Sequence, residues 1–537
     1  MLRRLTSPFL RAFEALTPGR RPEEQPLLPG YRRAPSQLLV FGLLSVLLLI
    51  CAVQGFLFAT MAPARVMPFT APLAILGMLV IWALPQGDYA PTPLLEPLFI
   101  GFFAALIVWP NYLAIALPSL PWVTMLRFFG FPLVAVLLIC VSTSKRVRAE
   151  IGEVLSIDRR IMQFLLGVIV LWTITLPMSR EIGVSLNRWI VAQVNWTGMF
   201  FVACWVFRRE GLITTWSKMF LTLTAVIGAM GIWESRIQQL PWVGFIPPYL
   251  RNDDPVVARI LAPHARHATP ELYRILSVQT TPLGLAELFG LAMPFAVHFA
   301  LNRYPPWLRV FGALWVPYAI HVILLTQSRL GLVACLSTVA FYVLIWALMR
   351  WRRVRASLIG PALVLAYPAL FLMLVGATFT IGKLRAKVIG DGSQTASDTG
   401  RKEQWLLGFQ RLEHNPFGHG MSQASDALGW RTVGGNTSID SYYLSVLLDI
   451  GILGFIFYFG LMIRAAYLGG RTLIANPNLE REHMLLFPLT VSLINFIIVK
   501  AVLSQDANHS VVFIMLGAIM ALIYRVRKSQ GATSGAS

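Results

Sequence analysis

Long runs of apolar residues recur along the 537-residue chain and decide what it can fold into. One run is "LLVFGLLSVLLLICAVQGFLFAT" (Leu38–Thr60) and another is "LIGPALVLAYPALFLMLVGATFT" (Leu358–Thr380). About 20 such residues in a helix cross the roughly 30 Å hydrocarbon core of a bilayer. Only helices and closed barrels satisfy their backbone in lipid, and these runs lack the alternating pattern of barrel strands. We therefore predict an all-α polytopic integral membrane protein.

The chain contains about fourteen apolar segments of this kind. With the amino terminus in the cytoplasm, most of the 45 Lys and Arg residues fall in the two tails and in alternate loops, as the positive-inside rule requires. The first 37 residues are basic and Pro-rich, lack the features of a signal peptide and are predicted to be a cytoplasmic tail. The predicted spans lie near residues 38–60, 68–84, 94–117, 128–143, 161–178, 189–207, 216–233, 281–301, 308–326, 330–349, 357–380, 441–463, 484–503 and 510–524.

This topology places both termini in the cytoplasm and divides the chain into seven parts. Three of them are membrane regions: an amino-terminal set of helices, a core set and a carboxy-terminal set. The others are two cytoplasmic tails and two large outer loops. In chain order the parts are 1–37 (tail), 38–233 (helices), 234–280 (outer loop), 281–380 (core helices), 381–440 (outer loop), 441–524 (helices) and 525–537 (tail).

The two outer loops are unusual because they carry basic residues on the side where the positive-inside rule expects few. There are five Lys and Arg residues in 234–280 and seven in 381–440, against four and six acidic residues. One interpretation is a pair of solvated loops of mixed charge, since long loops escape the rule. The other is an extracytoplasmic active site in which Arg binds an anion and a carboxylate handles a proton.

Several classes of function are excluded by what the chain lacks. The formal charge is +20, but its basic residues cluster at helix ends without the single stripe of a nucleic-acid-binding face, so no nucleic-acid partner is expected. The four cysteines lie in apolar runs without metal-ligand spacing, so neither a disulfide framework nor a zinc site is expected. There is no Walker motif, no GxGxxG after a strand, no HExxH and no GxSxG in a strand–turn–helix context. We predict no metal and no cofactor.

Two polar interruptions of the core helices are candidates for the site. In "LLTQSRLGLVACL", Ser328 and Arg329 lie at the predicted outer boundary between two apolar helices. Arg329 is either an interfacial anchor or a phosphate ligand, because guanidinium binds phosphate oxygens through a planar fork. In "YRILSVQTTPLGLAELFGLAMPF", Arg274 precedes a helix that contains Glu287. An ionisable residue in a span is expected to face the protein interior and to have a partner, so Glu287 is predicted to be a supporting residue.

The second outer loop contains a predicted amphipathic helix from about Asp398 to Leu412. Its apolar face is expected to lie along the membrane surface or to cap a cavity. Arg401 is in the first turn, where the helix dipole favours an acid, so an anionic partner is the more economical explanation. "NPFGHG" then forms a turn with His419 exposed, which is either inert or catalytic. The residues predicted to share the apolar face are Trp405, Leu406, Phe409 and Leu412.

A carboxylate ends the same loop in "GGNTSIDSYYLSVLLDIGILG" (Gly434–Gly454). Asp440 directly precedes an apolar helix, so it is either a helix N-cap or a general base, and the two roles are compatible. Nearby aromatic residues, among them Tyr443, can stack on sugar rings, although interfacial belts use the same residue types.

Four stretches combine into a known pattern: "RILSVQTTPLGLAELFGLAMPF", "LTQSRLGL", "TGRKEQWLLGFQRLEHNPFGHG" and "SIDSYYLSVLLDIGILGF". Their order and spacing resemble the O-antigen polymerase and ligase superfamily of polytopic glycosyltransferases (the Wzy and WaaL type). The resemblance covers about residues 270–465. It implies a GT-C-like, metal-independent enzyme that uses an undecaprenyl-diphosphate-linked glycan at the periplasmic face of the bacterial inner membrane. Arg329 and Arg401 match family arginines that would hold the diphosphate, with Arg274 as a third candidate.

One position departs from the ligase pattern. Ligases typically carry a His-Asn pair where this chain has Asp440 and Ser441. The resemblance is therefore closer to the polymerase branch, with Asp440 and His419 as the catalytic candidates and Arg329, Arg401 and Arg274 as diphosphate ligands. We predict polymerisation of lipid-linked oligosaccharide repeats into exopolysaccharide or O-antigen, with the lipid-linked glycan as both donor and acceptor and a chain-length regulator as a possible protein partner. The alternatives are ligation of glycan to lipid A core and, from another class, transport of lipid-linked glycan without catalysis.

Overall fold

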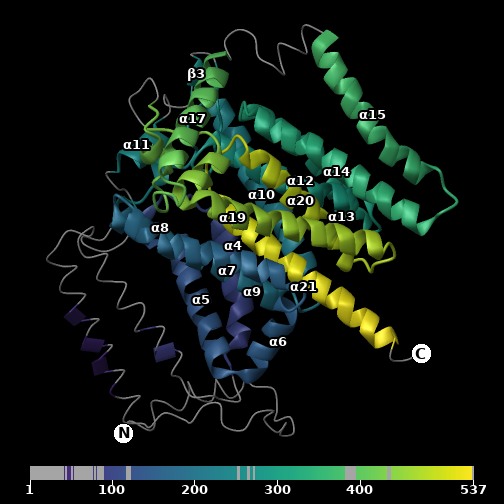
Figure 1. Cartoon of the computed structure of the whole chain (residues 1–537), viewed down its shortest axis with the longest axis horizontal. Helices are drawn as coiled ribbons and strands as arrows, with labels where there is room; N and C mark the ends of the chain where they lie inside the picture. Colours follow the sequence, from purple (N-terminus) through teal and green to yellow (C-terminus); the bar gives the residue numbers. More distant parts are fainter. Residues whose placement is uncertain are drawn as a thin grey trace.

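The structure is a computed structural model of the chain. It describes residues 90–115, 123–250, 254–262, 267–269, 272–380, 395–431 and 437–534, together with scattered residues between 42 and 81. The predicted spans near 38–60 and 68–84 lie largely outside the described residues. The rest is almost entirely helical (Figure 1).

The helices follow the predicted spans closely. Residues 90–250 form α4 (Leu95–Val108), α5 (Met125–Thr143), α6 (Lys145–Leu155), α7 (Arg159–Ile174), α8 (Ile182–Ala192), the π-helix η4 (Gln193–Gly198), α9 (Met199–Val206) and α10 (Leu212–Ile237). The remaining helices are α11 (Pro255–Leu261), α12 (Pro282–Leu301), α13 (Pro306–Leu325), α14 (Arg329–Arg353), α15 (Ile359–Thr380), α17 (Thr395–His414), α18 (Ala424–Leu428), α19 (Tyr442–Ala475), α20 (Leu486–Lys500) and α21 (His509–Ser534). Two antiparallel pairs of short strands join β1 (Ala114–Ile115) to β2 (Val123–Thr124) and β3 (His267–Thr269) to β4 (Leu272–Tyr273).

Ten helical segments of the described chain are long and apolar enough to cross a membrane. The prediction of an all-α polytopic membrane protein is confirmed. Burial separates central helices from peripheral ones: 94% of the apolar window of α21 is buried, against 33% in α5, α13 and α14. The peripheral helices carry exposed leucines, such as Leu314 and Leu336, as expected for surfaces that face lipid.

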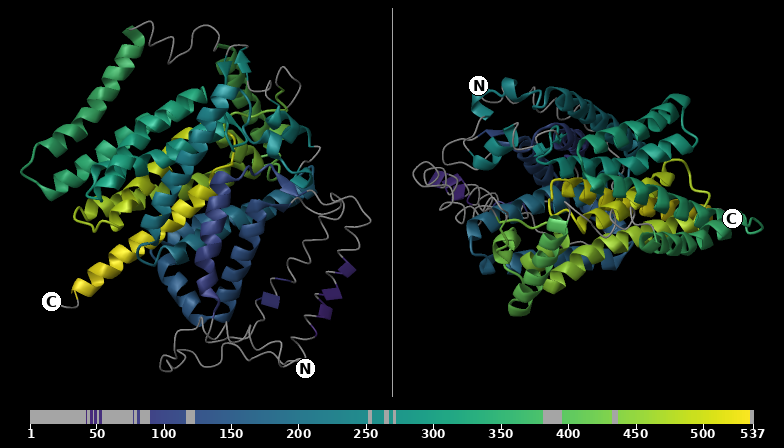
Figure 2. Two further views of the ribbon diagram at one scale, coloured as in Figure 1. Left: turned by 180° about the vertical axis from the view of Figure 1, so that it is seen from behind. Right: turned by 90° about the horizontal axis from the view of Figure 1, so that it is seen from above.

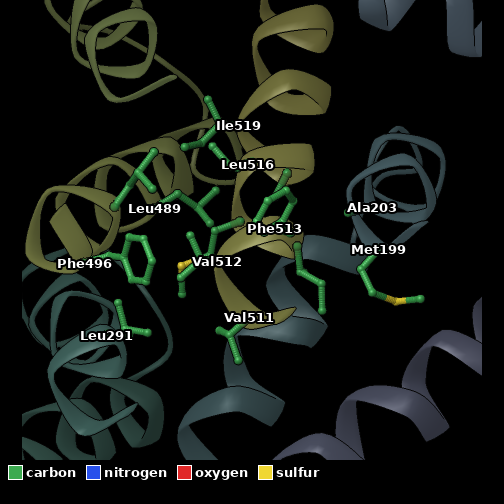
Figure 3. Close-up of a cluster of buried hydrophobic side chains, with 14 of the residues drawn as sticks. Met199, Ala203, Leu291, Leu489, Phe496, Val511, Val512, Phe513, Leu516 and Ile519 are labelled. Atoms are coloured by element: carbon green, nitrogen blue, oxygen red, sulfur yellow. The ribbon is translucent and has the colours of Figure 1, made fainter. Parts of the chain in front are cut away.

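At the centre of the molecule, apolar faces of several helices meet around α21. Figure 3 shows apolar side chains of α9, α12 and α20 meeting α21. Phe513 and Phe496 are fully buried there, and α21 packs against both α9 and α20. In this way α21 joins the amino-terminal helices to the carboxy-terminal ones.

The predicted outer loops emerge at one end of the helical bundle. In Figures 1 and 2, α11 and β3 from the first loop and α17 from the second lie at the same end. Helix α15 lies at the outer edge of the bundle and packs on α14. The predicted topology puts both loops on the same side of the membrane, so they are expected at the same end of the bundle.

The segment 144–160 differs from its prediction as a simple loop, because it contains helix α6. Ser144 accepts a hydrogen bond at its hydroxyl from the Val147 N–H (3.4 Å) and begins the helix. Val147, Ile151 and Val154 are buried and lie three or four residues apart on one face. Three charged residues between them lower the mean hydropathy, so a search for apolar spans overlooks this amphipathic helix.

Glu234 also differs from its prediction as a residue of the first outer loop. It lies in the last turns of α10 and is fully buried. Its carboxylate accepts hydrogen bonds from the Tyr273 hydroxyl (2.8 Å) and from the Ser277 N–H (2.6 Å). Because each bond joins α10 to the segment before α12, Glu234 fixes the return of this loop into the bundle.

Candidate active site

Arg401 and Asp440 lie close together at the start of α19. The Arg401 Nε is 3.9 Å from the Asp440 Oδ2, and the two side chains are 43% and 40% exposed. Helix α19 begins at Tyr442 with Ser441 as its N-cap residue, so Asp440 stands one residue before the cap. The interpretation of Asp440 as the N-cap is therefore wrong. Its carboxylate is directed to Arg401 and gives this arginine an anionic partner. Helix α17 begins at Thr395, so Arg401 lies in its second turn and not in the first as predicted.

Helix α17 is held on α19 partly by contacts that were not predicted. The Gln404 Oε1 accepts a hydrogen bond from the Asp440 N–H (2.9 Å), and Gln404 is buried. Four residues on, a Cβ on Gly408 would stand 2.4 Å from Leu444 Cδ1, so a glycine is required for this close approach. Leu406 and Phe409 are instead 67% and 51% exposed. Of the other two residues predicted for the apolar face, Leu412 is buried and Trp405 is half-buried, so the prediction holds in part. The seating contacts of Gln404 and Gly408 were not predicted, because neither residue adds to the hydropathy of a face.

The motif "DIGILG" contains a break in α19. Gly451 has φ +71°, which is non-helical, and the helix changes direction there. The break leaves the carbonyl groups of Leu448 and Asp449 to accept hydrogen bonds from the His419 N–H (2.8 Å) and the Gly420 N–H (3.0 Å). The Ile452 N–H beyond the break donates to the Pro416 carbonyl (3.2 Å). The turn "NPFGHG" therefore docks into the break, and the two motifs satisfy each other's backbone groups.

His419 is part of this docked turn. It is half-buried, not exposed as predicted, and its Nδ1 is 3.1 Å from the Leu448 carbonyl oxygen. A donor at Nδ1 would complete a second bond to the backbone of α19. The structure thus gives His419 an anchoring contact, and a catalytic role for it stays a prediction.

Asp449 was not singled out by the sequence, although it lies at the centre of this region. Its Oδ1 accepts hydrogen bonds from the Gln423 N–H (2.9 Å) and the Ala424 N–H (2.8 Å), at the start of α18. The carboxylate thereby holds α18 against α19. The signal that was available is an acidic residue in the apolar run "YYLSVLLDIGILG", which by default needs a partner.

A cavity of about 190 Å³ lies beside this junction. Ile439 and Tyr442, which flank the Asp440–Ser441 pair in sequence, both line it. Asp449 lines it from α19, Arg188 from α8 and Asp506 from the turn before α21. Arg188 and Asp506 form an ion pair across this wall. The sequence did not bring these two together because they lie on segments far apart in the chain.

Arg274, Ser328 and Arg329 form a second group at the end of α13. The Arg274 Nε donates a hydrogen bond to the Thr326 carbonyl (3.1 Å), and burial lowers the pKa of Arg274 from its ordinary value. An arginine remains protonated at neutral pH even so. Ser328 is the buried N-cap residue of α14, and Arg329 begins that helix with an exposed side chain. The predicted anion ligands thus have different protein contacts, Arg274 with the end of α13 and Arg401 with Asp440.

Of the three predicted supporting residues, Ser328 is the N-cap residue of α14, and Glu287 and Tyr443 have well-defined partners. Glu287 is buried and pairs with the fully buried Lys500 through its Oε1 (2.8 Å), while its Oε2 accepts a hydrogen bond from the Asn508 amide (2.9 Å). The expectation that Glu287 has an interior partner is confirmed. The Tyr443 hydroxyl donates to the Ile497 carbonyl (2.6 Å), so Tyr443 joins α19 to α20. Over the described ranges, no group of three or more His, Cys, Asp and Glu residues is arranged to hold a metal ion.

Comparison with known proteins adds one match. Residues 316–459 match the family model Wzy_C, described as O-antigen ligase. This region runs from α13 through α14, α15, α17 and α18 to the break in α19, so it includes Arg329, Arg401, His419 and Asp440. A search of curated proteins finds no match. The family indicates a membrane glycan-processing enzyme. The Wzy_C match at residues 316–459 is consistent with the resemblance of the motifs to the Wzy and WaaL type superfamily.

Proposed function

We propose that the protein is a glycosyltransferase that polymerises undecaprenyl-diphosphate-linked oligosaccharide repeats. The observation that carries this proposal is the ion pair of Arg401 with Asp440 within the matched region. It places a carboxylate and a guanidinium side by side on an exposed end of the bundle. In such a pair the carboxylate can accept a proton and the guanidinium can bind an anion. Glycosyl transfer from a diphosphate needs both.

The chemistry follows from these two groups. A hydroxyl oxygen of the acceptor sugar attacks the anomeric carbon of the donor and forms the new glycosidic bond. Asp440 takes the hydroxyl proton as this bond forms. The bond from the anomeric carbon to the diphosphate oxygen breaks, and the diphosphate leaves with the electron pair. Arg401 stabilises the charge that develops on that oxygen through its planar fork, with Arg329 and Arg274 as further ligands of the same anion.

Polymerisation is favoured over ligation by the residue at position 440. The superfamily's ligases typically carry a histidine there, whereas this chain carries an aspartate. Ligation to lipid A core is the second candidate, supported by the family's description as O-antigen ligase. In either case we place the site at the periplasmic face of a bacterial inner membrane, with both termini cytoplasmic and with a chain-length regulator as a possible partner.

Reconstitution of the purified full chain into liposomes tests these alternatives. Given only undecaprenyl-diphosphate-linked repeats, a polymerase produces a ladder of longer glycans on a gel. Given preassembled lipid-linked glycan and lipid A core, a ligase transfers the glycan to the core and leaves its length unchanged. Movement of the lipid-linked glycan across the bilayer without any new glycosidic bond would instead identify a transporter and overturn the proposal.

A further inference from the structure

The cavity of about 190 Å³ beside Asp440 is separate in its chemistry from the arginines assigned to the diphosphate. Its walls come from α7, α8, η4, α18 and α19 and from the turn before α21. We propose that it binds one neutral sugar ring of the glycan substrate and excludes acidic sugars. This inference rests on the proposed glycosyl transfer for the identity of the glycan, but its binding test does not require transfer.

The charges of the lining distinguish a sugar from a phosphate. Arg188 is the lining's one cation, and Asp449 and Asp506 are its two anions, so the formal charge of the lining is −1. Arg188 is already paired with Asp506. A diphosphate or a uronate placed here would meet two carboxyl groups and an arginine that is already paired with Asp506, which disfavours it electrostatically. A neutral polyhydroxylated ring meets no such penalty.

The same groups supply hydrogen bonds suited to hydroxyls. A carboxylate accepts up to about four hydrogen bonds, and the backbone N–H groups of Ser422, Gln423 and Ala424 use three at Asp449. At least one acceptor position of Asp449 therefore remains for a sugar hydroxyl. The side chains of Arg188 and Asp506 are 33% and 28% exposed, so the cavity reaches solvent along their side.

Two indoles also line the cavity. Trp172 and Trp196 line the cavity, and their ring centroids are 5.5 Å apart. Trp196 lies in η4, and single π-helical turns within α-helices are frequent at functional sites. A pyranose has a C–H face and a hydroxyl rim, and the lining supplies both apolar indoles and hydrogen-bonding carboxylates.

The location connects the cavity to the proposed chemistry. Ile439 and Tyr442 line it on either side of the Asp440–Ser441 pair. The Tyr442 ring is fixed from behind, because its centroid lies 4.6 Å from that of His509 and 5.4 Å from the Lys500 Nζ. A sugar ring bound in the cavity would thus contact a rigid wall close to Asp440, the catalytic candidate. This geometry favours a sugar next to the reacting bond.

The test measures direct binding to the full chain in lipid nanodiscs by saturation-transfer NMR. The probes are methyl glycosides of neutral hexoses and of N-acetylhexosamines, with methyl hexuronates as the acidic counterpart. We expect the neutral glycosides to bind and the hexuronates to bind at least tenfold more weakly at neutral pH. Absence of neutral glycoside binding, or equal binding of hexuronates, would overturn the proposal.

Two matched pairs of variants assign the binding to this cavity. Ser425→Phe fills the cavity from α18, while Ala427→Phe adds the same ring to a half-buried residue of α18 outside the lining. We expect the first to weaken binding at least tenfold and the second to leave it unchanged. Asp449→Asn removes a lining charge, so discrimination against hexuronates should shrink, whereas Asp426→Asn outside the lining should preserve it. Identical binding in Ser425→Phe and the wild type would show that the sugar binds elsewhere.

Failure of the sugar-binding proposal can be distinguished from failure of the proposed glycosyl transfer. Binding that follows the predicted variants, with no glycosyl transfer in reconstituted liposomes, would retain the sugar site and remove the polymerase proposal. Normal transfer together with normal binding in Ser425→Phe would retain the enzyme and remove the sugar site.

Discussion

The Nε of Arg401 in α17 lies 3.9 Å from the Oδ2 of Asp440, which precedes α19, although the two residues are well separated in the sequence. Both side chains are more than one-third exposed, and an exposed ion pair contributes only about 0–1 kcal/mol to stability. The pair is therefore of little use to the fold. In the proposed function, the pair holds a proton acceptor, Asp440, beside an anion ligand, Arg401.

Replacement of Arg401 tests its role as an anion ligand. A hydrogen bond to a charged group contributes about 1.5–3 kcal/mol, so Arg401→Ala should lower kcat/KM roughly 10- to 100-fold for the lipid-linked substrate. Arg401→Lys keeps the charge without the fork and should recover only part of the loss. Arg411→Ala, an exposed arginine on the same helix, serves as the control and should leave turnover unchanged. Equal turnover in Arg401→Ala and Arg411→Ala would exclude the proposed contact.

The break in α19 makes a prediction about stability. A Cβ on Gly451 would lie 2.2 Å from the Pro416 carbonyl oxygen, and φ is +71° there. Gly451→Ala should therefore displace the docked turn, at a cost of at least about 1–3 kcal/mol, and lower the apparent Tm of the detergent-solubilised protein by several degrees.

Gly470 supplies the matched control for this glycine. It lies in the same helix, and a Cβ there would meet nothing within 4 Å. Gly470→Ala should leave the apparent Tm unchanged or raise it, since alanine is favoured over glycine in a helix by roughly 0.5–1 kcal/mol. If both variants melt alike, the docking of the turn does not depend on the break.

His419 can be assigned to anchoring or to chemistry by two isosteric replacements. Asparagine presents an amide where histidine has Nδ1, and glutamine presents one near the position of Nε2. Because Nδ1 contacts the Leu448 carbonyl, we expect His419→Asn to keep most of the transfer activity and His419→Gln to lose thermal stability. The reverse pattern, an inactive Asn variant with a normal Tm, would make His419 a catalytic residue.

The buried pair of Glu287 and Lys500 should behave as one unit. Lys500→Met leaves the Glu287 carboxylate without its cation in a fully buried place, which costs about 3–5 kcal/mol. Glu287→Gln combined with Lys500→Met removes both charges and should restore most of the lost stability. Thermal unfolding of the single and double variants in the same detergent measures this coupling. Additive losses would show that the two side chains act independently.

The features that sequence could predict are those with a strong local signal. The membrane helices of the described chain appear near their predicted positions, because apolar runs of this length have few alternative structures in lipid. An anionic partner for Arg401 was expected from a place in the first turn of a helix, but α17 begins at Thr395 and Arg401 lies in its second turn. Glu287 had to have a partner because a lone charge in a span is costly.

The features that sequence could not predict depend on tertiary contacts. Gln404 and Gly408 seat α17 through a backbone hydrogen bond and a close approach, which no hydropathy pattern records. Arg188 and Asp506 meet across the cavity wall from distant segments. The docking of "NPFGHG" into the Gly451 break requires the three-dimensional path of both segments, although each motif was visible on its own.

The central claim is that Asp440 accepts the proton in glycosyl transfer. Its most direct test compares Asp440→Asn with Asp426→Asn, a matched change of an exposed aspartate on α18, in liposomes supplied with undecaprenyl-diphosphate-linked repeats. Loss of a general base typically lowers the rate about 10²–10⁴-fold, so Asp440→Asn should leave single repeats while Asp426→Asn and the wild type produce long glycans. Long glycans made at the wild-type rate by a folded Asp440→Asn protein would contradict the account.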